Sequence, residues 1–250
     1  MFKITTSWDD GDILDMRLTA LLEKYGATGT FYITKEYRRQ RLSDEQIRIL
    51  AARHEVGAHT LTHLDLRGLS RKQKASEIMG SKQWLEEVTG NAVEMFCYPS
   101  GHWDDESCEA VKDAGFAGAR TTEGGRIAIG DPFAMPVTLQ VYPFPLRKKD
   151  TDHFYWRYLF QPLAQRGSDL HALGVPWPSM YSWSNTAKVA FDIARRRGGV
   201  FHLWGHSWEI EKYGMWEELE GFLKWASSVP ETHFATNKEA VAYWKKNGSY

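Results

Sequence analysis

The fold is decided by residues 2–34, which read FKITTSWDDGDILDMRLTALLEKYGATGTFYIT. Within them, Phe2–Trp8 is rich in isoleucine and threonine, which is typical of a strand. Asp12–Tyr25 places isoleucine, methionine and leucine residues at helical spacing and stops before Gly26, so it predicts a helix. Thr28–Thr34 predicts a second strand. A strand, a helix and another strand in succession indicate two parallel strands joined by a right-handed crossover.

The same alternation extends along most of the chain. Further strands are predicted at Glu55–Ala58, Val93–Tyr98, Phe116–Arg120, Val200–Trp204 and His233–Thr236. Further helices are predicted at Ser43–His54, Ser70–Thr89, Asp104–Ala114, Asn185–Arg197, Trp216–Ser227 and Asn237–Lys246. Residues 131–182 lack a clear period and predict one or two strands within a long insertion. We therefore expect one α/β domain over residues 1–250, a distorted (β/α)7–8 barrel with an irregular insertion at 131–182.

The composition argues against several other classes of protein. A formal net charge of −1 gives no global field toward nucleic acid, so we expect no nucleic-acid partner. Two cysteines are too few for a disulfide framework. The first residues lack a secretory pattern and no apolar run reaches membrane-spanning length, so we expect no membrane span and a cytoplasmic location. The oligomeric state is not predicted.

Two adjacent carboxylates, Asp9 and Asp10, directly follow the first predicted strand. Neighbouring carboxylates repel each other, so a buried site would need a cation to keep both ionised. Gly11 lets the backbone turn and leaves room for a substrate. The alternative is an aspartate-rich turn that caps the next helix. In β/α barrels the functional groups lie at the carboxyl ends of the strands, and both aspartates fall there.

A pair of histidines, His59 and His63, follows the strand predicted at Glu55–Ala58. Residues four apart lie on one face of a helical turn, so both imidazoles could reach one ion. Together with Asp10 they would give two nitrogens and one carboxylate, which suits zinc best, with cobalt or nickel also possible. Three protein ligands leave positions open for water and substrate. The alternative is two unrelated surface histidines.

Two later histidines flank the end of another predicted strand. His206 lies where the strand should end and could be a general acid or base. His202 lies inside the strand and is equally consistent with a core histidine. The chain has 11 tryptophans, which predict either an aromatic core or platforms for sugar rings, and we take Trp208 as a candidate substrate contact.

Four motifs together carry a resemblance to a known family. They are Ser-Trp-Asp-Asp-Gly (7–11), His-Thr-Leu-Thr-His (59–63), Phe-Cys-Tyr-Pro-Ser-Gly (96–101) and Leu-Trp-Gly-His (203–206). In order and rough spacing the chain resembles the polysaccharide deacetylase family, also called carbohydrate esterase family 4 or the NodB-homology domain. The resemblance covers about 1–120 and 185–250 and implies a distorted β/α barrel.

The resemblance also implies roles for the matched positions. It makes Asp9 the catalytic base and His206 the general acid. It makes Asp10, His59 and His63 the metal ligands, and it makes Tyr98 and Pro99 part of the substrate groove. Our own mechanistic hypothesis adds a backbone N–H near Tyr98 that stabilises the oxyanion.

Two departures from the family pattern affect the catalytic groups. The family often has an arginine at the position of Cys97, where it supports the catalytic base. Arg120, at the end of the next predicted strand, could reach the same place or could be a surface residue. The acidic partner of the late histidine is also not evident from the sequence. The candidates are Asp104, Asp105 and Glu123.

The expected function is metal-dependent removal of the acetyl group from an N-acetylated sugar. We expect a cytoplasmic precursor of a surface polysaccharide, such as an O-antigen, as substrate. The insertion, with aromatic residues at 153–158 and basic residues at 147–149, could select the sugar, decorate the fold or mediate oligomer contacts. The alternatives are an amidohydrolase of small cyclic amides or ureides on the same fold and a non-catalytic carbohydrate-binding protein.

Overall fold

A parallel sheet curled into a barrel forms the centre of the protein. The computed structural model describes residues 2–147, 156–230 and 232–247, and within them eight strands form one sheet in the order β5-β4-β3-β2-β1-β7-β6, with β8 paired to β1. The strands are β1 (Lys3–Asp10), β2 (Thr30–Ile33), β3 (Glu55–Ala58), β4 (Met95–Cys97), β5 (Gly118–Arg120), β6 (Leu139–Gln140), β7 (Val200–Gly205) and β8 (Phe234–Ala235). The predicted barrel is confirmed.

The longest strand, β1, lies in the middle of the sheet. It pairs with β7 from Lys3 to Trp8, with β8 at Ile4 and Thr5, and with β2 from Ser7 to Asp10. Every residue of β1 after Lys3 is buried, as expected for a strand covered on both faces. The carboxyl ends of β1, β2 and β7 are therefore level, which brings the residues that follow them together.

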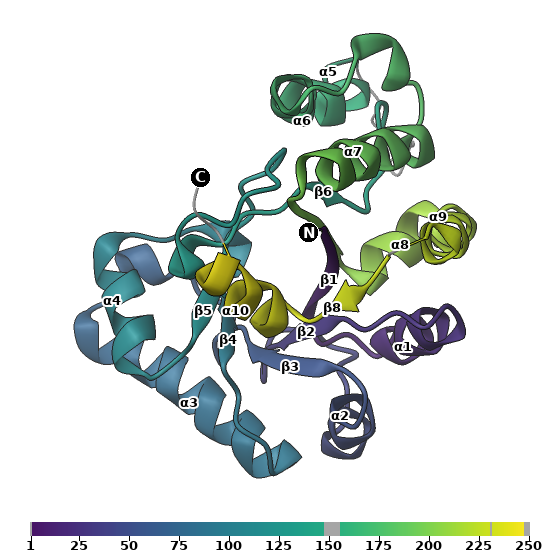
Figure 1. Cartoon of the computed structure of the whole chain (residues 1–250). Helices are drawn as coiled ribbons and strands as arrows, with labels where there is room; N and C mark the ends of the chain where they lie inside the picture. Colours follow the sequence, from purple (N-terminus) through teal and green to yellow (C-terminus); the bar gives the residue numbers. More distant parts are fainter. Residues whose placement is uncertain (1, 148–155, 231, 248–250) are drawn as a thin grey trace.

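Helices surround the sheet, and most were predicted. The helices are α1 (Asp15–Lys24), α2 (Asp44–Ala51), α3 (Arg71–Thr89), α4 (Asp105–Asp113), α5 (Trp156–Leu159), α6 (Gln161–Leu173), α7 (Trp183–Arg197), α8 (Ser207–Tyr213), α9 (Trp216–Ser228) and α10 (Asn237–Asn247). Short 3-10 turns lie at Leu66–Gly68, Pro99–Gly101, Pro132–Ala134 and Trp177–Ser179. Figure 1 shows the helices outside the ring of strands, with α10 crossing in front of the ring.

The start of the predicted insertion is part of the barrel. Met135 pairs with Arg120 at the end of β5, because the Met135 N–H donates to the C=O of Ala119 and the Met135 C=O accepts from the N–H of Thr121. Three residues later, Thr138 N–H donates to the C=O of His202 in β7. This segment, together with β6, bridges the gap between β5 and β7, so the sheet closes through irregular chain rather than through a regular strand.

The prediction of an irregular region over 131–182 was therefore wrong in part. α6 is a regular helix of 13 residues that ends at Gly174 with left-handed backbone. Few residues of this helix are buried, among them Leu170 and Leu173, so its sequence needs only a weak apolar stripe. A weak stripe does not predict a helix. The basic residues Lys148 and Lys149 and the aromatic residues at 153–155 lie outside the described residues.

No helix in the described part of the chain is both long enough and apolar enough to cross a bilayer.

Candidate metal and active site

The two carboxylates at the end of β1 lie on either side of a sharp backbone turn. Asp9 still has extended backbone in β1, whereas Asp10 has φ of 83° and Gly11 has φ of 70°. Left-handed backbone costs free energy for a residue other than glycine. At Gly11 a side chain is also excluded, because a Cβ atom would come within 2.6 Å of Ile33. The turn places both carboxylates at the same end of the barrel, where a regular strand would point them to opposite faces.

The two histidines of the predicted metal set come from a loop after β3. The expected helical turn was wrong: Thr60 and His63 both have positive φ, 62° and 59°, and the first helical turn begins only at Leu66. The loop nevertheless brings the two rings together, with centroids 4.8 Å apart for His59 and His63. The histidines meet through a tight loop, so the spacing predicted the contact for the wrong structural reason.

A carboxylate that the sequence analysis did not identify fixes this loop. Glu77 of α3 accepts hydrogen bonds from the backbone N–H groups of Leu61 and Thr62, at 2.9 and 3.0 Å, and from the Thr62 hydroxyl at 2.9 Å. The N–H of His63 donates to the Thr60 hydroxyl at 2.9 Å. Nothing in the helical pattern around Glu77 indicated this role, because it depends on how α3 packs against the loop.

The oxygen and nitrogen atoms of the predicted metal set converge on one point. Oδ1 of Asp10 lies 3.9 Å from Nε2 of His59 and 3.7 Å from Nε2 of His63. This oxygen is buried and has no hydrogen-bond partner among the described residues. The other oxygen accepts a hydrogen bond from Nε1 of Trp208 at 2.9 Å. A buried carboxylate oxygen is expected to have a partner, so this arrangement fits a divalent cation between the three side chains.

The protonation of His59 also suits a metal ligand. Its Nδ1 lies 2.7 Å from the backbone C=O of Cys97, which can only accept, so Nδ1 carries the hydrogen and Nε2 has a free lone pair. Burial lowers the pKa of His59 to about 4, so the ring is neutral at pH 7. Burial also lowers the pKa of His63, whose ring stacks on Tyr37 at 4.1 Å.

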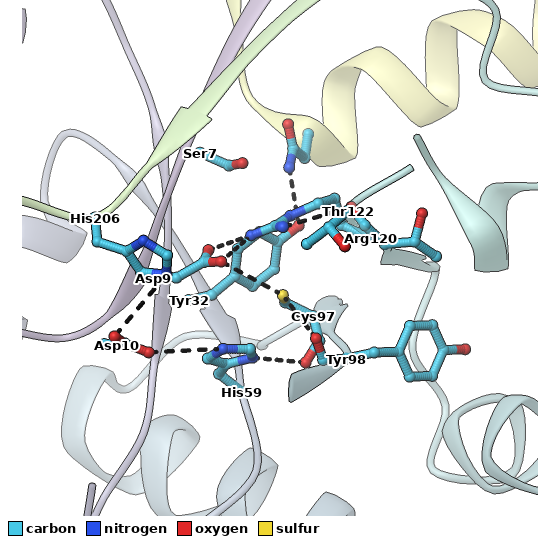
Figure 2. A network of polar contacts seen from close by, with 12 residues as sticks. Ser7, Asp9, Asp10, Tyr32, His59, Cys97, Tyr98, Arg120, Thr122 and His206 are labelled. Carbon is cyan, nitrogen blue, oxygen red and sulfur yellow. Dashed lines mark hydrogen bonds and ion pairs between the residues drawn. The ribbon is translucent and has the colours of Figure 1, made fainter. Parts of the chain in front are cut away.

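Asp9 is held by the arginine that the sequence analysis proposed. Nη2 of Arg120 donates to both carboxylate oxygens of Asp9. Cys97 and Arg120 are paired in register on β4 and β5, so an arginine on the neighbouring strand reaches the place left by the cysteine (Figure 2). Burial alone would raise the pKa of Asp9, but the charge and hydrogen bond of Arg120, with the charges of His59 and His206, lower it overall.

The guanidinium of Arg120 lies between two aromatic rings. Its Cζ is 5.3 Å from the ring centre of Tyr32 and 4.9 Å from that of Trp204. The side chain is fully buried, which is rare for arginine unless it is paired. The pair with Asp9 and the contacts with the rings together fix the orientation of the Asp9 carboxylate toward the cavity.

The acidic partner of His206 is a residue that was not among the candidates. Nδ1 of His206 lies 2.6 Å from Oε2 of Glu209, in the first turn of α8. Burial would lower the pKa of His206, but the hydrogen bond with Glu209 and the charge of Asp10 raise it to about 9. The spacing of His206 and Glu209, three apart at a helix start, was a signal available in the sequence, but α8 was not predicted.

The three candidates for that role lie elsewhere. Asp104 caps α4 and accepts hydrogen bonds from the buried Lys74, Asp105 is exposed, and Glu123 pairs with Arg126 at the surface. None of them is near enough to contact the imidazole. Asp104 and Asp105 lie at the start of α4 and Glu123 follows β5, whereas His206 follows β7, so closeness along the chain to a motif did not predict closeness in space.

A chain of hydrogen bonds continues from Glu209 to the insertion. Oε2 of Glu209 accepts from Nε2 of Gln140 at 3.1 Å, and Oε1 of Gln140 accepts from Nη2 of Arg166 in α6. Arginine can only donate, so the Gln140 amide has one possible orientation, with its NH2 group toward Glu209. The closing segment of the barrel thereby holds the partner of His206.

The candidate site opens onto a cavity of about 580 Å³. It is lined by the predicted site residues Asp9, Asp10, His59, His63, His206 and Trp208. Its outer wall includes Arg166 and Asp169 of α6 and Tyr37 of the loop after β2.

Two predicted groove residues are not in this cavity. Tyr98 is fully buried, and its hydroxyl donates to the C=O of Phe133. Pro99 is also buried, whereas Ser100 lines the cavity. The N–H of Tyr98 donates to the C=O of Arg120 and is therefore not available to an oxyanion. The predicted positions were too early in the motif, because the chain turns toward the cavity only at Ser100, where φ is 56°.

His202 is a structural residue. It is buried in β7, with Nε2 2.8 Å from the Ser7 hydroxyl and Nδ1 3.1 Å from the C=O of Pro136. Burial lowers its pKa to about 3. It holds the closing segment against β7 and does not reach the cavity.

Comparison with known proteins finds a family match in the first half of the chain. The family model described as polysaccharide deacetylase matches residues 2–119. Over residues 2–119, slightly less than half of its length, the chain is similar to the polysaccharide deacetylase family. The match includes both aspartates of β1 and both histidines of the loop, and it ends one residue before Arg120. His206 and Glu209 lie beyond it.

Two curated relatives and one solved structure extend this comparison. YxkH of Bacillus subtilis, provisionally named a polysaccharide deacetylase, is 32% identical over 108 residues, which are 42% of this chain and 39% of that protein. The peptidoglycan-N-acetylglucosamine deacetylase of Bacillus cereus is 28% identical over 115 residues, 45% of this chain and 53% of that protein. The chain therefore spans about half or less of the curated polysaccharide deacetylases that it matches.

The third comparison concerns the fold alone. A crystal structure from Mycobacterium smegmatis, also provisionally named a polysaccharide deacetylase, superposes with a TM-score of 0.69 at 15% identity. The alignment covers 100% of this chain and 92% of that one. The barrel of the polysaccharide deacetylases thus extends through the second half of this chain, where the family model does not match.

Proposed function

We propose that this chain is a metal-dependent hydrolase that removes the acetyl group from an N-acetylated sugar. The observation that carries the proposal is the buried Oδ1 of Asp10, which faces Nε2 of His59 and of His63 and has no other partner among the described residues. The match of residues 2–119 to the polysaccharide deacetylase family model supports the reaction class.

In this proposal Asp10, His59 and His63 hold the cation. Two imidazole nitrogens and one carboxylate oxygen favour zinc, with cobalt or nickel as alternatives. A divalent cation in this place supplies a Lewis acid for the acetyl carbonyl and lowers the pKa of a nearby water. The Trp208 indole and the Cys97 carbonyl orient two of the three ligands from behind.

Asp9 is the proposed general base. Arg120 keeps its carboxylate ionised and orients it, so that it can accept a proton from a water that attacks the acetyl carbonyl. The new C–O bond replaces the C–N bond of the amide, and acetate leaves as the amine is released. The Cys97 thiol, 3.9 Å from the same carboxylate, has its pKa raised by burial and stays neutral.

His206 is the proposed general acid. Its Nδ1 is held by Glu209, which leaves Nε2 on the cavity side, 4.0 Å from Oδ2 of Asp10. An amine is a poor leaving group unless it is protonated, and His206 lies where it can donate that proton. Glu209 stabilises the charged imidazole before the transfer, in the manner of a carboxylate–histidine pair.

The substrate identity and the location are predictions within this proposal. A precursor of a surface polysaccharide, such as an O-antigen, in the cytoplasm is the substrate we would test first. Fractionation of cells producing the protein, with antibody detection, tests the location. A protein found only outside the cell would contradict it.

The experiment that tests the reaction is acetate release from a panel of N-acetylated sugars. Protein stripped of metal is compared with the same protein given zinc, cobalt or nickel. We expect acetate only from metal-loaded protein. Full activity after complete metal removal would contradict the metal site. Ring opening of a cyclic amide, or sugar binding without any acetate, would indicate one of the two alternatives from the sequence.

A further inference from the structure

One cation in the cavity wall has only neutral hydrogen-bonding partners. Arg166 of α6 lines the cavity, its Nη2 donates to Oε1 of Gln140, and its Cζ lies 4.9 Å from the ring centre of Tyr142. Among the described residues no carboxylate lies within ion-pair distance of this guanidinium. An amide oxygen and an aromatic ring stabilise a cation, but neither neutralises it.

The carboxylates in the interior of the same cavity are compensated. Asp9 is paired with Arg120, and Glu209 is paired with His206. In the proposed function the third carboxylate, on Asp10, would face the cation. Arg166 is therefore the charged group of the cavity wall that a substrate could neutralise.

A second guanidinium lies near Arg166. The guanidinium of Arg147 lies 5.5 Å from the ring of Tyr142, the ring that Arg166 also contacts. Burial lowers the pKa of Arg166, and the charge of Arg147 lowers it further. The charges of Tyr142 and Glu209 act in the opposite direction and raise it. An anion that reached Arg166 would offset the cost of burying its charge beside Arg147.

One group opposes such an anion. Asp169 lies one turn further along α6 and also lines the cavity, but its side chain is exposed to solvent. Solvent weakens its repulsion, whereas Arg166 is partly buried. The balance at this wall therefore favours a negative ligand.

We propose that Arg166 binds a negatively charged group of the substrate, a phosphate or a carboxylate, so that the substrate is an anionic N-acetylated sugar. The inference rests on the proposed function and names its substrate class. Arginine binds both groups through paired N–H donors. A cavity of about 580 Å³ has room for a sugar with one such group, since ligand cavities are typically about 300–1,000 Å³.

The test is binding and turnover with matched sugars and metal-loaded protein. The probes are N-acetylglucosamine, N-acetylglucosamine 1-phosphate and N-acetylmuramic acid, which are neutral, a phosphate and a carboxylate. Dissociation constants are measured by calorimetry, and kcat/KM by acetate release. A charge-assisted hydrogen bond of about 1.5–3 kcal/mol predicts about 10–100-fold tighter binding of a charged probe.

Three variants separate the contribution of Arg166 from other effects. Arg166→Gln should reduce binding of the charged probe to that of N-acetylglucosamine. Asp169→Asn, at an exposed position where misfolding is not expected, should tighten binding of the charged probe severalfold and leave the neutral probe unchanged. Arg196→Gln, which removes an exposed arginine at the end of α7, is the control for net charge and should change neither.

The outcomes distinguish a failure of the anion site from a failure of the proposed deacetylase function. Tighter binding of only one charged probe would identify the phosphate or the carboxylate as the group recognised. Equal affinity for all three probes, or a preference that survives in Arg166→Gln, would overturn the role of Arg166. Binding that follows the predicted order without any acetate release would retain the anion site and contradict the deacetylase.

Discussion

The two halves of the chain contribute different parts of the candidate site. Residues 2–119, which match the family model, supply Asp9 and Asp10 at the end of β1 and His59 and His63 in the loop after β3. Residues after 119 supply Arg120 and Glu209, which pair with Asp9 and His206, and the part of the cavity wall that comes from β6 and α6. The first half places a cation-binding set by local turns. The second half tunes and encloses that set through contacts between distant segments.

Removing a ligand from the first half should have the largest effect. His63→Ala is expected to abolish both tight metal binding and acetate release, because a proposed ligand is lost. The control is His102→Ala, an exposed histidine that pairs with Asp65. Metal content by mass spectrometry and acetate release are measured together. Metal retained at full occupancy would show that the loop does not bind it.

The second prediction distinguishes the proposed general base, Asp9, from the proposed metal ligands in the same half of the chain. Asp9→Asn should retain the metal but reduce kcat by about 10²–10⁴-fold, the usual contribution of a general base. Calorimetry with zinc and acetate release give the two readouts. Loss of metal in this variant would place Asp9 in the ligand set instead.

The third prediction tests the link between the halves. Arg120→Met leaves the Asp9 carboxylate buried without its partner, which should cost about 3–5 kcal/mol in the free energy of unfolding. Urea denaturation measures this cost. The double variant Arg120→Met with Asp9→Asn should recover part of it. A single variant as stable as the unaltered protein would mean that the pair contributes little.

A smaller loss is expected from the partner of the proposed acid. Glu209→Gln removes a charge-assisted hydrogen bond to His206, so kcat should fall about 10–100-fold with metal binding unchanged. Glu217→Gln, in an exposed position of α9, is the matched control. An unchanged kcat would contradict the proposed role of the pair.

The smallest effect should come from Gln140, the middle residue of the chain of hydrogen bonds. Gln140→Leu removes one neutral donor to Glu209, and a loss of about 0.5–1.5 kcal/mol corresponds to a few-fold decrease in kcat. KM for a neutral N-acetylated sugar should not change. A decrease as large as that of Glu209→Gln would mean that Gln140 is essential for holding the carboxylate.

The difference between the halves also explains what the sequence could predict. The βαβ order and the candidate metal ligands were evident, because each ligand follows a recognisable strand. The two-residue strand β6 and the polar helix α6 were missed, since neither has a clear hydrophobic period. The proposed contact between Arg120 and Asp9 was correct. Arg120 on β5 is paired in register with Cys97 at the end of β4, so its side chain reaches the same place.

The partners chosen by tertiary packing could not be predicted in the same way. Glu77 lies in a helix whose pattern describes only its own amphipathic face, and its hydrogen bonds to the loop depend on the approach of that helix. Tyr98 shows the opposite error, because the motif was found but the residue at its centre points into the core. A motif locates a turn more accurately than it locates the side chains within it.

The hydrogen bond from Trp208 to Asp10 has a consequence for the choice of ion. With one carboxylate oxygen taken by the indole, Asp10 offers a single oxygen, so the protein presents one hard ligand and two softer nitrogens. Calcium requires about six to eight oxygen ligands, and magnesium dehydrates reluctantly. A millimolar background of either ion should therefore leave the occupancy of this site by a scarcer transition metal unchanged.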